Sequence, residues 1–151
     1  MLSDLESNIV LIISAATWAI TQTLKVIIIL VQEKRLDWSY FVTSGGMPSS
    51  HSATVCALAT SVAMTEGLAS VFFSISVVLA VIVMYDAAGV RQSVGQHSAF
   101  LNRIVKEFKI NSSKDLEQNF REFIGHTPFQ VFIGAILGIL ISWSWVTIAA
   151  H

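Results

Sequence analysis

The sequence predicts an all-α integral membrane protein, a bundle of about four transmembrane helices with an amphipathic helix on its cytoplasmic side. Of the 151 residues, 54% are hydrophobic and only 13% are charged, a balance outside that of soluble domains. The hydrophobic residues are also grouped in blocks that are long enough to cross a bilayer. We expect residues 1–151 to form a single domain. A soluble helical core is the alternative, but so small a domain cannot shield three continuous apolar blocks from water.

Three of the predicted spans are long. They run from Ile9 to Val31, from Leu68 to Ala88 and from Phe129 to Ala150. A fourth stretch, Ser52 to Met64, is apolar and rich in small residues but short, which suits a helix partly enclosed by the others. The single cysteine, Cys56, lies in this stretch, so we expect no disulfide framework and an inert packing role for the thiol.

The basic residues predict the orientation in the membrane. Four spans place residues 32–51 and 89–128 on one side, and these two loops hold every Lys and Arg of the chain except Lys25. The positive-inside rule therefore places both loops in the cytoplasm and both termini outside, so that a site built from the loops faces the cytoplasm. This asymmetry is a membrane signal and predicts no nucleic-acid partner. The compact chain without a targeting extension favours a bacterial plasma membrane.

An apolar stripe at helical spacing lies in the second loop. Its members are Phe100, Leu101, Ile104, Val105 and Phe108. Charged residues surround the stripe, which predicts an amphipathic helix that lies at the membrane surface or packs over the bundle. After it, Thr127 and Pro128 are expected to start the last span as its N-cap and first turn.

A glycine-rich turn followed by a helix start precedes the short span, in the sequence Ser-Gly-Gly-Met-Pro-Ser-Ser-His-Ser. Gly46 allows the backbone to turn close to a ligand, and Pro48 suits the first helical position. The helix N–H groups and the hydroxyls of Ser49 and Ser50 can then bind an anion. His51 can hold or release a proton near neutral pH. An ordinary turn that caps a helix is the alternative.

The second loop and two further residues can complete this anion site. Arg91 and His97 are separated by five residues, and a break near Gly95 would let both side chains converge. Lys25 lies within a span, where burial of a charged side chain costs so much free energy that a functional role is expected. The alternative is a lysine whose side chain snorkels to the cytoplasmic surface. His126 precedes the last span and is either a residue at the helix entry or a ligand contact.

The order of these motifs resembles that of a known superfamily. Pro48-Ser49-Ser50-His51, followed by Arg91 and then by His97, resembles the second and third signature motifs of the type 2 phosphatidic acid phosphatases. Vanadium haloperoxidases and bacterial acid phosphatases belong to the same superfamily. The glycine-rich lead and the later Gly-His-Thr-Pro sequence look like its divergent, small, membrane-embedded branch. The resemblance extends from Lys25 to Gly138.

The resemblance implies a phosphohydrolase that needs no metal or cofactor and works through a phosphohistidine. His97 matches the nucleophile and His51 the general acid, which later activates water. Arg91 matches a bidentate phosphate clamp, and Ser50 part of an oxyanion cradle. With the residues of the turn and its surroundings, the expected substrate-binding set is Lys25, Gly46, Ser49, Ser50, Arg91 and His126.

Two departures from the family pattern bear on this assignment. The family's first motif has a lysine, six residues and then Arg-Pro, whereas nine residues separate Lys25 from Arg35 and no proline follows. The family also has an aspartate four residues after the nucleophilic histidine, and here that position is Leu101. We expect Asp86, at the cytoplasmic end of the third span, to replace this catalytic partner. The further candidates are Glu122 and Asn102.

Three functions follow from these residues. The first is a membrane phosphatase acting on a phosphorylated lipid at the cytoplasmic leaflet. The second is a non-catalytic protein that binds or translocates a lipid phosphate, an alternative motivated by the missing aspartate. The third is a metal-dependent hydrolase built on His51, His97 and His126.

Two glycines of the last span, Gly134 and Gly138, have the spacing of a close helix–helix contact. They can mark the face of a homodimer. Close packing inside one subunit is the alternative.

Cysteine labelling tests the predicted orientation. In a Cys56→Ala background, Ser3→Cys should react with an impermeant maleimide added from outside, because both termini are expected there. Ser112→Cys should react only after the membrane is opened. Labelling of position 112 but not of position 3 from outside would reverse the orientation.

Overall fold

The computed structural model of the chain describes residues 8–33, 46–89, 100, 104 and 126–149. The helices described over their full length in these segments are α2 (Ile9–Glu33), α3 (Ser50–Glu66), α4 (Val71–Ala88) and α7 (Pro128–Ala149). No strand occurs in these described segments, which confirms the all-α prediction for them. Among them, α2, α4 and α7 are long and apolar enough to cross a membrane, whereas α3 has only 17 residues. Apart from Phe100 and Ile104, the expected amphipathic helix lies outside the described residues.

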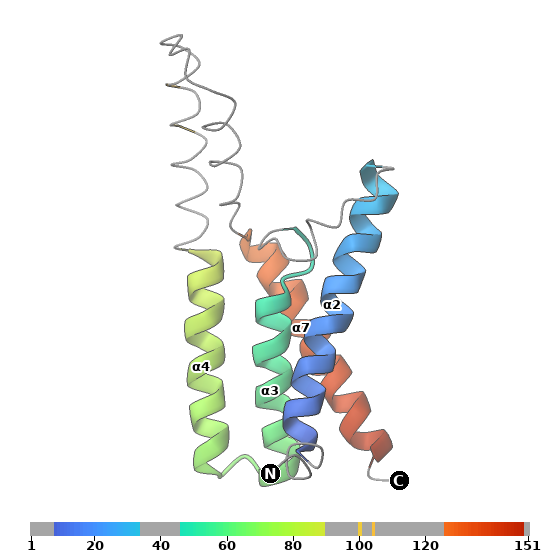
Figure 1. Ribbon diagram of the computed structural model, residues 1–151. Coiled ribbons are helices and arrows are strands. Elements are labelled where there is room, and N and C mark those ends of the chain that lie inside the picture. Colours follow the sequence, from blue (N-terminus) through green and yellow to red (C-terminus); the bar gives the residue numbers. More distant parts are fainter. Residues whose placement is uncertain (1–7, 34–45, 90–99, 101–103, 105–125, 150–151) are drawn as a thin grey trace.

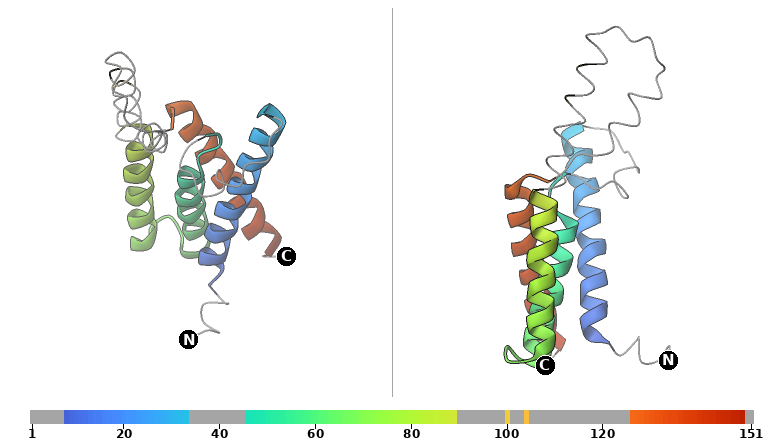
Figure 2. Two further views of the ribbon diagram at one scale, coloured as in Figure 1. Left: turned by 45° about the horizontal axis from the view of Figure 1, so that its top comes forward. Right: turned by 90° about the vertical axis from the view of Figure 1, so that its left-hand side faces the viewer.

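The helices alternate in direction, and α3 lies at the centre (Figure 1). It packs against α7, α4 and α2, whereas these three helices make much less contact with one another. The end of α2, the start of α3, the end of α4 and the start of α7 all lie at one end of the bundle, here called the site end (Figures 1 and 2). Four segments that are distant in the sequence therefore lie at the same end of the bundle.

Serine hydroxyls cap the starts of α3 and α4. Ser49 is the N-cap of α3, and Ser70 is the N-cap of α4, where its hydroxyl accepts a hydrogen bond from the Phe73 N–H at 3.1 Å. The third span was expected from Leu68, but α4 begins only at Val71 because the chain turns between Gly67 and the cap. The expectation for Pro48 is likewise wrong: this residue lies before the N-cap of α3 and not in the first helical turn.

The bundle is apolar outside, and most of its buried residues are small or polar. Phe72 is 66% exposed and Ile82 is 60% exposed, although both belong to a continuous apolar helix. The buried positions of the same helix are Ser76, Ala80 and Ala87. A soluble core would show the opposite distribution. In a bilayer, the lipid tails solvate the apolar faces, and helices associate through small residues and hydrogen bonds.

The closest helix contact joins α3 and α7. A Cβ atom on Gly134 would overlap the carbonyl oxygen of Ser49, and one on Gly138 would overlap that of Ala53 and lie 2.8 Å from its carbon. Both pairs advance by four residues, so the two helices run parallel in one register. We call this contact the α3–α7 seam. The glycines are therefore buried inside one subunit, and this face is not free for a homodimer.

Gly138→Val should disrupt the seam. The added side chain would meet the backbone of Ala53, which cannot rotate away, so we expect the free energy of unfolding to fall by about 3 kcal/mol. The gain in helix propensity is below about 1 kcal/mol and cannot offset this loss. Thermal unfolding in detergent measures the effect. Ile139→Val, at a position that is 46% exposed, is the control and should change little. Equal midpoints for the two variants would contradict the seam.

Candidate functional site

The start of α3 places three serines inside the protein at the site end. Ser49 caps the helix, and its hydroxyl accepts hydrogen bonds from the Ser52 N–H at 3.4 Å and from the Ser52 hydroxyl at 3.0 Å. Ser50, between them, is only 2% exposed. The positive end of the helix dipole and these hydroxyls lie together, an arrangement that suits an anion.

The start of α7 is hydrogen-bonded to this cap. The Ser49 N–H donates to the backbone carbonyl of Gln130 at 3.3 Å. Gln130 lies one helical turn before Gly134 of the α3–α7 seam. Thr127 and Gln130 form a capping box, because the Gln130 N–H donates to Thr127 Oγ1 at 3.3 Å and Gln130 Oε1 accepts from the Thr127 N–H at 3.1 Å. This bears out the expected roles of Thr127 as N-cap and Pro128 as first turn.

Two histidines meet beside the cap. The rings of His51 and His126 lie edge to face, with centroids 6.2 Å apart and planes at 61°. His126 is 1% exposed, whereas His51 is half-buried. The Nδ1 atom of His126 lies 3.3 Å from Gln130 Oε1. The contact joins the first turn of α3 to the residue before the capping box of α7.

Lys25 is enclosed in the bundle below the glycine-rich turn. Its side chain is fully buried, so it does not extend to the surface as a snorkelling lysine would. Gly46 has a φ of +80°, and a Cβ atom there would lie 3.6 and 3.7 Å from Cγ and Cδ of Lys25. The turn therefore covers the aliphatic part of this side chain, and an amino group lies within the bundle on α2.

The remaining expected residues are only partly described. Asp86 is half-buried in the last turn of α4, at the site end. Arg91 and His97 lie outside the described residues, as do Leu101, Asn102 and Glu122. The approach of Asp86 to His97 therefore stays a prediction. Among the described residues, no three His, Cys, Asp or Glu side chains gather as metal ligands.

Sequence reasoning missed Gln130, which contacts the cap, the Thr127 N–H and His126. A signal was present, because Thr-x-x-Gln before an apolar run is the pattern of a capping box. The additional contact with His126 depends on tertiary structure and has no local signal.

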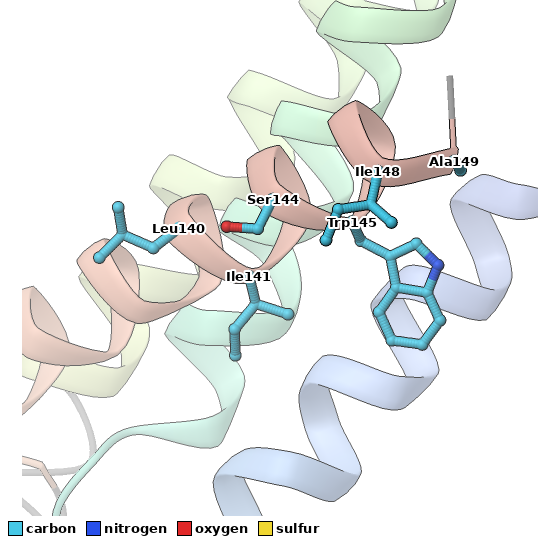
Figure 3. Close-up of a pocket in the computed structure, with 6 residues that line it drawn as sticks. All are labelled: Leu140, Ile141, Ser144, Trp145, Ile148 and Ala149. Atoms are coloured by element: carbon cyan, nitrogen blue, oxygen red, sulfur yellow. The ribbon is translucent and has the colours of Figure 1, made fainter. Parts of the chain in front are cut away.

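A groove on the last turns of α7 lies away from these residues (Figure 3). Its lining comprises Leu140, Ile141, Ser144, Trp145, Ile148 and Ala149. It begins ten residues after Gln130, about 15 Å further along the helix. The lining contains no titratable side chain, so this groove does not supply the chemistry.

Comparison with known proteins confirms the family resemblance. The family model described as "Divergent PAP2 family" matches residues 6–141. The "Uncharacterized membrane protein YuiD" of Bacillus subtilis (strain 168) is 40% identical over 149 residues, covering 92% of this chain and 94% of the relative. No solved structure matches the chain. The relative's membrane character and the three apolar helices together support an integral membrane protein.

Alanine substitutions at two glycines can distinguish the effect of backbone strain from an effect on the candidate site. Gly46 and Gly67 have φ values of +80° and +85°, so alanine at either position should cost about 1–3 kcal/mol of stability. Only Gly46 adjoins Lys25, whereas nothing lies within 4 Å of a Cβ on Gly67. Gly46→Ala should therefore also weaken the binding of inorganic phosphate several-fold, measured by calorimetry, and Gly67→Ala should not. Equal phosphate binding by the two variants would argue against a site beneath the turn.

Proposed function

Because this chain belongs to the divergent PAP2 family, we propose that it is a membrane phosphatase that hydrolyses a lipid phosphate or diphosphate at the cytoplasmic leaflet. The observation that carries the proposal is the position of His51. It lies in the first turn of α3, next to the buried Ser49 and Ser50, and its ring contacts a second histidine. In the proposed function His51 is the proton donor, and the start of α3 beside it binds the phosphate.

The proposed reaction has two steps. His97 attacks phosphorus in line, the bond from phosphorus to the alkoxide breaks, and His51 gives its proton to that oxygen. In the second step His51 removes a proton from water, which attacks the phosphohistidine and releases inorganic phosphate. Both histidines then return to their starting states.

The other residues of the site stabilise charge on the phosphoryl group. Arg91 donates two hydrogen bonds to its equatorial oxygens, and Ser50 with the helix N-terminus holds the third. A preorganised donor of this kind contributes roughly 3 kcal/mol in the transition state. The Lys25 side chain reaches the same volume from α2, and Asp86 orients His97.

The membrane determines the class of substrate. The site end is one end of a bundle whose outer faces are apolar, so an acyl or isoprenoid tail can lie against the protein while the phosphate reaches the cap. A soluble phosphate ester gains nothing from this position. The positive-inside rule places the site end at the cytoplasmic leaflet, and a bacterial plasma membrane suits the chain and its relative.

A second candidate function is binding or translocation of a lipid phosphate without turnover. Leu101 favours it, because an apolar side chain stands where the superfamily has the aspartate that orients the nucleophile. The two functions share the phosphate site and differ only in whether phosphate is released.

Phosphate release from three lipids tests the proposal. Protein in nanodiscs should hydrolyse phosphatidic acid, phosphatidylglycerol phosphate or a polyprenyl diphosphate, and activity should persist in strong chelator. His97→Ala should abolish the acid-labile, base-stable phosphoenzyme. His51→Ala should lower turnover by about 100-fold or more, because the acid is lost. His151→Ala is the matched control and should retain full activity.

Three outcomes would contradict parts of this proposal. Binding of all three lipids without release would favour the second candidate. Loss of activity in chelator would favour a metal-dependent hydrolase. Phosphoenzyme that persists in His97→Ala but disappears in His51→Ala would exchange the two histidine roles.

A further inference from the structure

The groove on the last turns of α7, here called the α7 groove, has no part in the proposed chemistry. All of its lining residues come from α7, and they form two rows at i, i+4 spacing. One row is Leu140, Ser144 and Ile148, and the other is Ile141, Trp145 and Ala149. The small side chain of Ser144 leaves space between its two larger neighbours (Figure 3). The volume of about 460 Å³ lies in the range of sites that hold a small ligand.

A stripe of side chains on α7 connects this groove with the site end. It has helical spacing and comprises Gln130, Ile133, Leu137, Ile141 and Ser144. At its start, Gln130 accepts the hydrogen bond from the N-cap of α3. The three apolar members are half-buried, so the stripe follows the edge between the buried α3–α7 seam and the lipid-facing surface. A lipid tail that begins at the cap and follows this stripe enters the α7 groove.

The depth of the groove limits which tails can reach it. The groove begins about 15 Å along α7 from Gln130 and extends about 13 Å further, to Ala149. The hydrocarbon core of a bilayer is about 30 Å thick, so the chains of one leaflet reach about 15 Å inward. The groove therefore lies in the half of the bilayer opposite the site end. An ordinary acyl tail ends where the groove begins, whereas a longer tail continues into it.

From this placement we propose that the α7 groove binds the far end of the substrate's tail. The protein then prefers a lipid phosphate or diphosphate whose tail is longer than one leaflet, which is a long isoprenoid chain and not the acyl chains of phosphatidic acid. The inference rests on the proposed function, because the phosphate site fixes where the tail begins.

The preference arises from packing and not from the hydrophobic effect. A tail that enters the groove leaves lipid of the same polarity, so it gains only van der Waals contacts with the lining. The branched side chains and the indole of Trp145 supply these contacts. Because each contact is weak, we expect a moderate preference of about fivefold.

Ser144→Phe and Ser74→Phe form a matched pair. Both serines are exposed in the half of the bundle opposite the site end, but only Ser144 lines the groove. In nanodiscs, Ser144→Phe should lower kcat/KM about fivefold for a polyprenyl diphosphate of about ten isoprene units, mainly through KM. Farnesyl diphosphate, whose tail stays within one leaflet, should change by less than about twofold. Ser74→Phe should leave the ratio of the two substrates unchanged.

Photolabelling tests the groove without turnover. A long polyprenyl phosphate with a diazirine at the far end of its tail should label the segment Leu140–Ala149, and Ser144→Phe should reduce this label. Phosphatidic acid with a diazirine at the end of an acyl chain should not label the segment. The matching polyprenol, which lacks the phosphate, should label it much less. Equal labelling by the alcohol and the phosphate would show uptake of any long lipid and would overturn the inference.

The two experiments keep the two proposals apart. If the wild type releases phosphate but Ser144→Phe changes both substrates equally, or neither, the tail site is wrong and the phosphatase stands. If no lipid is hydrolysed but the groove is labelled only by the phosphate, the proposed turnover fails and the tail site stands in a lipid-phosphate binding protein. Absence of both hydrolysis and labelling would contradict both proposals.

Discussion

The direct backbone contact between α3 and α7 determines the geometry of the rest of this protein. Gly134 and Gly138 have no side chains, so the carbonyls of Ser49 and Ala53 lie against α7 itself. This contact brings the first turns of two parallel helices together, and the hydrogen bond from Ser49 to the α7 backbone then forms. The arrangement of the candidate site follows from this packing, because each helix brings one histidine to the junction.

The bilayer explains why such a site can be built from so short a chain. Since lipid solvates the apolar faces, the interior is available for small and polar residues, including a fully buried lysine. The signature motifs of the superfamily contain cationic and hydroxyl side chains that are expected to surround one phosphate group. A soluble domain of this size would need the same interior volume for its hydrophobic core.

The sequence predicted the parts that depend on local pattern. Apolar blocks located α2, α4 and α7 to within a few residues, and Thr127 marked the start of the last helix because hydroxyl caps are a local signal. The start of α4 was misplaced because Leu68 is apolar yet belongs to a turn after Gly67. The spacing of Gly134 and Gly138 predicted a close helix contact but not the partner helix. The same Gly-x-x-x-Gly spacing occurs in contacts between two subunits and in contacts within one subunit. The meeting of His51 with His126 depends on helix register, which no local pattern encodes.

An experimental structure of the chain in nanodiscs with orthovanadate bound tests the central claim most directly, because vanadate adopts the geometry of in-line attack at phosphorus. The account predicts vanadate at the site end, bonded to the ring of His97, with His51 on the opposite apical oxygen and Ser50 and Arg91 around its equator. Vanadate bound elsewhere, or a complex in which the imidazoles of His51 and His97 face opposite sides of the bundle, would contradict it.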